Sequence, residues 1–288
     1  MPARALLTRQ WFPAREVIYL NGLSNVFFGL VVGGGLVMAP VILDLTDGDW
    51  RMTLRIFGLY LAGITVLWTV LGRERTNDAD KDVVTSQGLD VLKGALAHRD
   101  LWIGGLGFVG ATISFGAFLA FYPTLMLEEY DISLRLTGGI LALGVIVGGI
   151  GGMGIAWAAS TSGREKNFLQ VLGLLMIGSN LGMVLTGSVP ALFVLSFFNG
   201  VAWAFFPILV TVPFHLPGLR PRELAVAFAF TMMMTSVGTS LGPLLTGFLQ
   251  EAFDDLKLAL FVISFTSVSL ILAGSTLRFE AQRQTIGS

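Results

Sequence analysis

The sequence predicts an all-α polytopic membrane protein with eight transmembrane helices. Hydrophobic residues make up 54% of the 288 residues and charged residues only 13%, and the mean hydropathy is +0.76. Soluble domains carry about twice this fraction of charge. Eight apolar stretches are each long enough for the ~20 residues that cross a hydrocarbon core. We read them all as helices, because lipid-exposed backbone must satisfy its own hydrogen bonds and the sequence has no alternating barrel pattern.

The eight spans divide into two and six around a long polar segment. The expected spans are 17–43 and 52–72 before it and, after it, 101–127, 136–159, 168–188, 191–214, 224–250 and 258–277. The polar segment, residues 73–99, carries charges of both signs and no long apolar run. We therefore expect a linker that ends in a surface helix around Leu89 to Ala97.

The distribution of basic residues predicts the orientation. Fourteen Lys and Arg residues lie in the segments that share a side with the two ends and with residues 73–99. The opposite side has four, which are Arg51, Arg55, Arg135 and Lys257. Basic loops stay preferentially in the cytoplasm. We expect a multi-pass protein of the cell membrane with the linker and both termini in the cytoplasm.

Several functional classes are disfavoured by composition. The chain has no cysteine, which excludes disulfides and cysteine-based metal sites. A net charge of −1, without a basic run interleaved with aromatics, gives no reason to expect nucleic acid. His98 and His215 lie in different expected loops, and the six later spans contain no charged residue. We therefore expect no enzyme, no metal and no cofactor.

Two distant stretches repeat one pattern. Residues 13–44 and 221–251 each start with a basic and acidic pair, run apolar for a membrane's thickness and end at acidic residues. Each also has a G-x-x-x-G step, formed by Gly29 and Gly33 in the first copy and by Gly238 and Gly242 in the second. The copies are offset by 207 to 209 residues. They are expected to be equivalent helices of a repeated half.

Four short motifs resemble the major facilitator superfamily. They are WFPARE at 11–16, DWR at 49–51, GTSLGPLLTG at 238–247, and AWAASTSGREK at 156–166. The last occupies the place of the family's G-x-x-x-D-R-x-G-R-R loop: Gly163 and Arg164 remain, while Ser160 stands at the aspartate position. The motif is therefore degenerate, and it does not predict the gating ion pair that the family builds on that aspartate.

The resemblance implies two half-bundles that rock against each other. Residues 1–72 would be the last two helices of an N-terminal half-bundle, 73–99 a cytoplasmic linker, and 100–288 a six-helix C-terminal half-bundle with a cytoplasmic tail. Four helices would then be missing ahead of Met1, so the chain resembles an N-terminally truncated member; a natural eight-span protein is the alternative. The implied function is secondary active or facilitative transport of a small organic solute by alternating access, with or without a coupling proton or ion. A non-transporting fragment is the alternative function, and a monomer is favoured.

The family arrangement also suggests which side chains face a substrate cavity. Its cavity-lining helices correspond to 101–127 and 191–214, and the candidates at helical spacing are Ser114, Phe118, Phe121, Tyr122, Asn199, Trp203, Phe206 and Thr211. Pro207 would loosen the helix beside them by removing a backbone donor. Without a fixed charge, the solute is expected to be neutral or amphipathic, or an anion with its positive partner elsewhere. The alternative is that these aromatics pack between helices.

Small and polar residues mark candidate helix contacts. They are Asn21, Asn25, Gly29, Gly33, Gly144, Gly148, Gly152, Thr231, Thr235, Gly238, Gly242 and Pro243. Small residues let helix backbones approach closely. The pattern fits either a gate that opens and closes during transport or static packing, and the sequence leaves both open.

Overall fold

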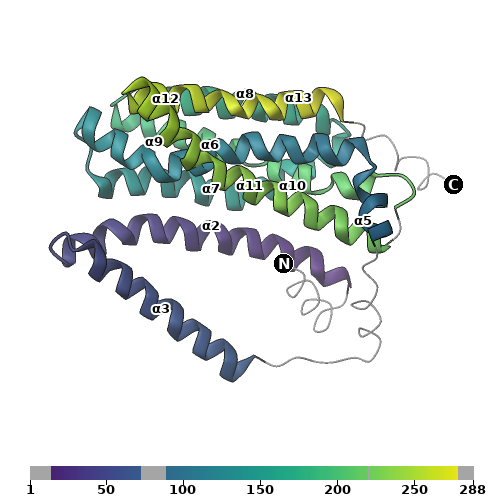
Figure 1. Cartoon of the computed structure of the whole chain (residues 1–288), viewed down its shortest axis with the longest axis horizontal. Helices are drawn as coiled ribbons and strands as arrows, with labels where there is room; N and C mark the ends of the chain where they lie inside the picture. Colours follow the sequence, from purple (N-terminus) through teal and green to yellow (C-terminus); the bar gives the residue numbers. More distant parts are fainter. Residues whose placement is uncertain (1–13, 73–88, 220, 278–288) are drawn as a thin grey trace.

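The computed structural model describes residues 14–72, 89–219 and 221–277, and eight segments of membrane-spanning length run through them, as predicted (Figure 1). The described residues contain helices and no strand. The helices are α2 (Ala14–Leu45), α3 (Trp50–Leu71), α5 (Leu89–Leu96), α6 (Arg99–Tyr130), α7 (Leu134–Ser162), α8 (Glu165–Leu185), α9 (Val189–Ala202), α10 (Phe205–Val210), α11 (Pro221–Phe253), α12 (Leu256–Ser264) and α13 (Val268–Thr276). Two 3₁₀ turns complete the spans, η2 (Val212–His215) and η3 (Phe265–Ser267).

Local signals define several helix ends. Asp49 starts α3 by accepting hydrogen bonds from the backbone N–H groups of Arg51 and Met52, at 2.9 and 3.2 Å. Asp255 starts α12 in the same way, accepting from Leu258 N at 3.0 Å. These acidic N-caps satisfy donors that a helix start leaves unpaired.

The span predicted as one helix over 191–214 is divided into α9, α10 and η2, which corrects the sequence-based expectation. Pro207 has no backbone N–H, so the carbonyl of Trp203 accepts instead from Phe206 N at 3.0 Å. Just before it, Trp203 N and Ala204 N also donate three residues back, at 3.1 Å each. The break therefore lies between Trp203 and Ala204, one turn ahead of the proline.

The last span, predicted as a single helix over 258–277, is also interrupted, in this case without a proline. The hydroxyl of Thr266 lies 2.8 Å from two carbonyl oxygens, that of Ile263 in its own span and that of Gly110 in α6, and can donate to either. Ser264 Oγ bonds Leu260 O at 2.8 Å. Hydroxyls that compete for helix carbonyls loosen the α-helical ladder, and here the 3₁₀ turn η3 results.

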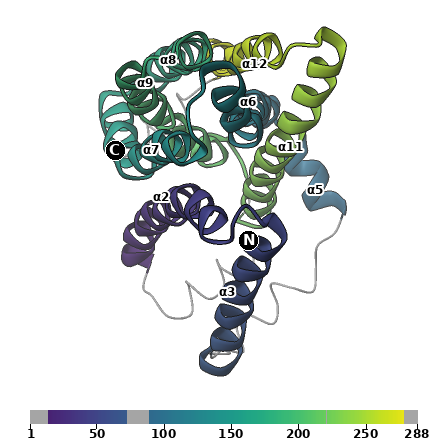
Figure 2. The same cartoon turned by 90° about the vertical axis from the view of Figure 1, so that its left-hand side faces the viewer.

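The six spans after residue 98 form one bundle (Figure 2). Helix α6 packs against α11 on one side and against α12, η3 and α13 on another; α8 packs against α9 and α13, and α9 against α7. Buried apolar side chains form two large clusters along the bundle, one around Phe108 and Phe205 and the other around Tyr122 and Met183, and a smaller third cluster at the end near α5.

Glycines allow α6 and α11 to approach closely within this bundle. A Cβ atom added at Gly238 would lie 2.5 Å from the carbonyl oxygen of Val109, and one at Gly242 would lie 2.7 Å from Ala117 N. On the facing helix, a Cβ at Gly116 would meet the carbonyl of Thr239. Because the obstacles are backbone atoms, only glycine allows this contact.

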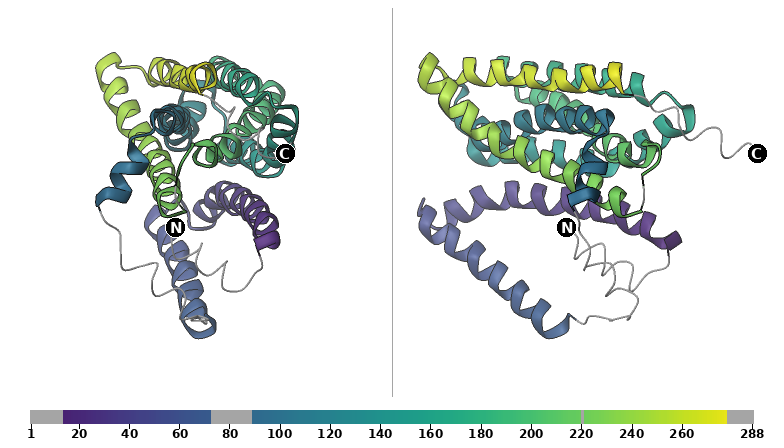
Figure 3. Two further views of the ribbon diagram at one scale, coloured as in Figure 1. Left: turned by 90° about the vertical axis from the view of Figure 1, so that its right-hand side faces the viewer. Right: turned by 45° about the vertical axis from the view of Figure 1, so that its right-hand side comes forward.

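The two-helix unit consists of α2 and α3. Its substantial contact with the bundle is made by α2. Helix α2 lies along α7, while α3 turns away after the hairpin at residues 46–49 (Figure 3). Thr53, in the first turn of α3, is buried. In the apolar window with which α3 would cross the membrane, no residue is buried. The unit therefore meets the bundle along one helix.

The surface helix expected near residues 89–97 is present as α5, and residues 73–88 of the linker lie outside the described residues. Ala95 is buried with Leu101, Ala227 and Phe230, so α5 packs on the first turns of α6 and α11. The indole Nε1 of Trp102 donates to the carbonyl of Leu96 at 2.9 Å. The end of the linker is thus fixed to one end of the bundle.

Candidate functional site

Four of the eight predicted cavity residues line a cavity inside the six-helix bundle. Ser114 and Phe118 reach it from α6, Asn199 from α9, and Trp203 from the break that follows α9. Residues of α7 and α8 complete the wall, and the cavity volume is about 30 Å³. Solute pockets measure about 300–1,000 Å³. In this conformation the cavity has room for water but not for an organic solute.

A hydrogen-bonded pair of amides lies at this cavity, with Asn180 buried and Asn199 half-buried. Asn199 Nδ2 donates to Asn180 Oδ1 at 2.7 Å and to Ser179 Oγ at 3.2 Å, which links α9 to α8. The Asn180 side chain is only 3% exposed. Neither Asn180 nor Ser179 was predicted as a site residue. An asparagine within an apolar span was the available signal, since an amide in lipid needs a partner.

The other four predicted residues do not meet at this cavity. Tyr122 is fully buried, stacks on Phe118 with ring centroids 5.3 Å apart, and donates its hydroxyl to Met183 O at 3.2 Å. Phe206 packs edge-on against Phe108, and Phe121 faces α11 beside Gly247. Thr211 is exposed and bonds Ile208 O in its own helix at 2.7 Å.

A cluster of hydroxyls that the sequence reasoning missed joins α6 to the last span. Ser114 Oγ lies 2.9 Å from both Thr266 Oγ1 and Ser267 Oγ. One and two turns away, Thr266 bonds Gly110 O at 2.8 Å and Ser269 bonds Gly107 O at 3.0 Å. Hydroxyl-to-carbonyl bonds of this kind hold membrane helices together. The sequence signal for this cluster was the group of hydroxyl residues in SFTS at 264–267, within an otherwise apolar span.

The predicted glycine face of α7 packs on α9 and the start of α10. Cβ atoms at Gly144 and Gly148 would lie 3.0 Å from Ser196 O and 2.9 Å from Trp203 Cβ, and at Gly152 the nearest atom is Ala204 Cα at 3.7 Å. The Ser196 hydroxyl donates to the carbonyl of Ile140 across the same contact. These three glycines therefore lie at an interface within the bundle.

The glycines predicted on the first span face a different side of α7. A Cβ at Gly29 would lie 3.0 Å from Val145 O, and one at Gly33 would lie 2.9 Å from Ile146 Cγ1. From α7, a Cβ at Gly138 would meet the carbonyl of Leu36. The side chains of Asn21 and Asn25 lie outside the described part of α2.

The predicted stripe on α11 packs on α6, as described for Gly238 and Gly242. Thr231 is buried and donates to Ala227 O at 3.0 Å, and Thr235 donates to Thr231 O at 3.1 Å. The ring of Pro243 comes within 3.2 Å of a Cβ placed at Gly116. All these contacts are inside the six-helix bundle.

The loop that resembles a family motif forms the end of α7. The side chain of Ser160 lies outside the description, and its backbone is in the last turns of the helix. Gly163 has φ +60°, and Arg164 N donates to Ala159 O at 3.3 Å. This left-handed glycine with a six-to-one hydrogen bond is a Schellman C-cap.

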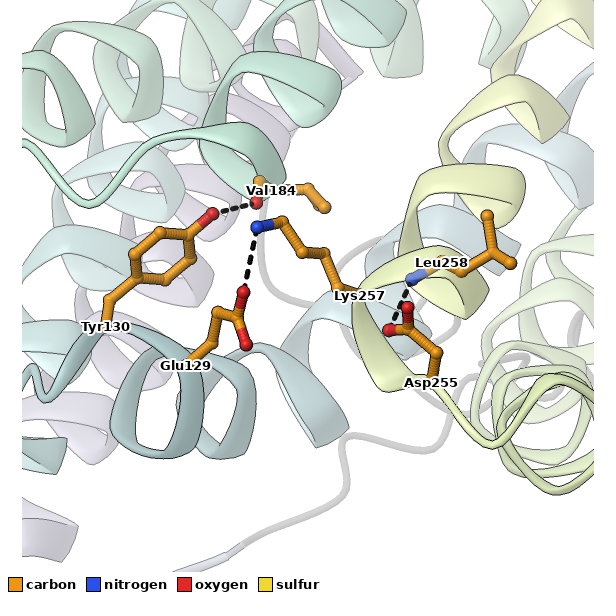
Figure 4. A network of polar contacts seen from close by, with 6 residues as sticks. All are labelled: Glu129, Tyr130, Val184, Asp255, Lys257 and Leu258. Atoms are coloured by element: carbon orange, nitrogen blue, oxygen red, sulfur yellow. Dashed lines mark hydrogen bonds and ion pairs between the residues drawn. The ribbon is translucent and has the colours of Figure 1, made fainter.

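A polar network closes the end of the bundle opposite to α5 (Figure 4). Lys257 Nζ of α12 lies 2.9 Å from Glu129 Oε1 of α6 and 4.9 Å from the ring centroid of Tyr130. The Tyr130 hydroxyl donates to Val184 O of α8 at 2.8 Å. Three spans are thus joined at one surface. In the described ranges, no group of three or more His, Asp or Glu side chains could hold a metal ion.

Comparison with known proteins gives matches of three kinds. The family model described as "Major Facilitator Superfamily" matches residues 1–219. A curated relative from Bacillus subtilis (strain 168), described as "Uncharacterized transporter YybO", is 23% identical, and the match covers 65% of this chain and 47% of that protein. The chain therefore spans about half the length of this relative.

A solved structure shares the fold. It is described as "Crystal Structure of A Bacterial Homolog to Human Lysosomal Transporter, Spinster, in Inward-facing And Unoccupied Conformation". The two superpose with a TM-score of 0.61 over 95% of this chain and 72% of that chain, at 15% sequence identity.

Proposed function

Because the chain belongs to the Major Facilitator Superfamily, we propose that it is a secondary active or facilitative transporter that moves a small organic solute by alternating access. It is an integral multi-pass membrane protein of a transporter family. Beyond family membership, we propose that the solute is a small organic molecule and that the two units move against each other. We also propose that the protein lies in the cell membrane with its linker and both ends in the cytoplasm. It also assigns residues 1–72 and 100–288 to two half-bundles joined by the linker 73–99.

The observation that carries the proposed motion is the contact between α2 and α7. The two-helix unit meets the bundle along this pair, at positions where small residues let the backbones approach, among them Gly29, Gly33 and Gly138. Small residues let the two helices lie close together, and Ile146 of α7 packs against Gly33 of α2; we propose that the two units tilt against each other at this contact. Members of this family work by such rocking of their halves. We therefore assign α2–α7 as the seam across which the units move.

The proposed solute is neutral or amphipathic. The cavity wall contains amide, hydroxyl and aromatic side chains and no ionised one. An unpaired charge would be costly to place against such a wall. We propose Asn199 and Trp203 as the side chains that contact the solute, with Ser114 and Phe118 beside them, once rearrangement of α6 to α9 enlarges the cavity.

Uptake into proteoliposomes tests the proposal. The purified chain is reconstituted and supplied with a panel of radiolabelled neutral solutes. For a solute that accumulates, Asn199→Ala and Trp203→Ala are expected to reduce the rate at least about tenfold, as for loss of a good hydrogen bond at a binding site. The matched controls are Asn167→Ala and Trp68→Ala, since both side chains are exposed.

The outcomes separate the alternatives. Unchanged uptake in both cavity variants would remove Asn199 and Trp203 from the solute site. If the folded wild-type chain takes up none of the solutes, the alternative of a non-transporting form is favoured. The amount of protein in the liposomes is measured in every case.

A further inference from the structure

The amide pair of the cavity has hydrogen-bonding capacity left over. Asn199 Nδ2 and Asn180 Oδ1 are used on each other, 2.7 Å apart. Within the described part of the chain, no group accepts from the Asn180 amide nitrogen and none donates to the Asn199 amide oxygen. The Asn180 side chain is buried, so water from the bulk does not reach it. Buried amide groups nearly always find a partner in the protein or in ordered water.

Two further polar groups lie on the same wall. The Ser196 hydroxyl gives its proton to Ile140 O and keeps its oxygen lone pairs. The Trp203 indole N–H has no acceptor among the described residues. The lining residues thus carry unused donors, on Asn180 and Trp203, and unused acceptors, on Asn199 and Ser196. They lie on two neighbouring helices and on the break that follows one of them.

The cavity volume fits the number of unused groups. The cavity holds about 30 Å³, and a buried water needs roughly 10–15 Å³ of space and two to four polar partners. About two waters can therefore be accommodated, with these four polar groups available as partners. An apolar cavity of this size would stay dry, but this wall is not apolar.

We propose that this cavity is an internal water site, in which about two waters bridge Asn180 and Trp203 as donors to Asn199 and Ser196 as acceptors. The waters satisfy the amide pair between α8 and α9 directly beside the break in the helix at Trp203. The proposal concerns the same cavity as the proposed solute site, but it describes the resting protein and holds whether or not the chain transports.

Two methionines make the site measurable. Met176 and Met183 line the cavity and are 1% and 2% exposed, so bulk solvent does not reach them. Met126 is 0% exposed and does not line the cavity. When a short X-ray pulse converts bound water to hydroxyl radicals, a neighbouring thioether is oxidised to the sulfoxide. Met126 is the internal control for burial without water.

The experiment is X-ray hydroxyl-radical labelling of the purified chain in lipid nanodiscs, without any solute, read by mass spectrometry of the peptides. Met176 and Met183 are expected to be oxidised several-fold faster than Met126. Their oxidation should also persist when a radical scavenger is added to the bulk solution. A double variant, Asn180→Leu with Asn199→Leu, fills the space with apolar groups and should reduce both rates to that of Met126.

The wild-type protein alone can overturn the proposal. Equal oxidation of all three methionines, or oxidation that the bulk scavenger abolishes, would mean that no water is held in the cavity. If the double variant fails size-exclusion chromatography, Asn180→Leu alone is used, and unchanged oxidation in that variant would also contradict the assignment. Because no solute is present, none of these results depends on transport.

Discussion

The two-helix unit and the six-helix bundle are both built from apolar spans, yet they pack very differently. In α3 none of the membrane-spanning window is buried, whereas in α6 the buried share is 67%. The difference follows from whether the small residues of a helix face another helix. The packed face of α6 includes Gly107, Gly110 and Gly116, where a Cβ would meet atoms of another helix. The glycines of α3 before its C-cap, Gly58 and Gly63, face nothing within 4 Å.

The comparison shows that hydropathy identifies a span but not its neighbours. Lipid solvates a leucine about as well as another helix does, so apolar surface alone does not bring membrane helices together. Close backbone approach and interhelical hydroxyl bonds do. In this chain both occur between α6 and its neighbours in the bundle, and α2 has the close approach alone, on α7.

The largest effect is expected from filling the contact between α6 and α11. In Gly242→Leu the new Cβ atom would clash with Ile113 O and Ala117 N. Both are backbone atoms of α6, so no change of side-chain rotamer relieves the clash. Overpacking usually costs about 1–3 kcal/mol and more against a rigid backbone. We expect neither Gly242→Leu nor Gly238→Leu to form a folded bundle, so neither variant should transport. Fluorescence-detected size-exclusion chromatography checks this, through loss of the monodisperse peak.

The control for these variants is on the same helix. At Gly247 the nearest atom to an added Cβ is Phe121 Cζ, at 3.9 Å. Gly247→Ala should therefore elute and unfold like the wild type. Normal folding of Gly242→Leu would show that α6 and α11 are not in close contact in the membrane.

A matched pair of leucines measures the difference between the two regions directly. Leu260 of α12 is fully buried, and Leu61 of α3 is 62% exposed. Leu260→Ala should reduce the free energy of unfolding by about 2–5 kcal/mol, because it leaves a cavity. Leu61→Ala should change it by less than about 0.5 kcal/mol. Thermal unfolding in detergent gives both values; equal losses would mean that α3 is packed against protein.

The smallest effect is expected at two acidic N-caps, one in each region. Asp255→Ala removes the acceptor for Leu258 N and should destabilise the bundle by about 1 kcal/mol. Asp49→Ala removes the same kind of cap from α3 but should leave bundle unfolding unchanged. Its effect should appear as faster amide hydrogen exchange in the first turn of α3. A change in bundle unfolding of the same size in both variants would contradict the separation of the two units.

Sequence reasoning correctly gave the eight spans and the family, because length, hydropathy and motif position determine them. It did not give the breaks in two spans. Pro207 was noted, but its effect appears a turn earlier, at Trp203, and the hydroxyl-driven break at Thr266 depends on Gly110 in another helix. The relevant contact is distant in sequence, so local patterns do not contain it.

The candidate site was only partly predictable for the same reason. Helical spacing placed Ser114 and Phe118 on one face, and both line the cavity. It also grouped them with Tyr122, which lies in the core and bonds Met183 of α8. Asn180 was overlooked, since its importance comes from Asn199, nineteen residues later and on another helix. Which polar groups pair is decided by helix packing, which spacing within one span does not report.

The most direct test of the account is a reversible cross-link across the seam between α2 and α7. The chain has no native cysteine, so an introduced pair reacts without background. Ile146 Cγ1 lies 2.9 Å from a Cβ at Gly33, which places Gly33→Cys and Ile146→Cys within reach of a disulfide. Gly35→Cys with Ile146→Cys is the control, because Gly35 faces nothing within 4 Å.

We expect the first pair to cross-link readily in membranes and the control pair not to. Once cross-linked, the protein should stop taking up its solute, and a reductant should restore uptake, because the two units can no longer tilt. Absence of the cross-link, or full uptake while it is intact, would contradict the assignment of α2–α7 as the moving seam.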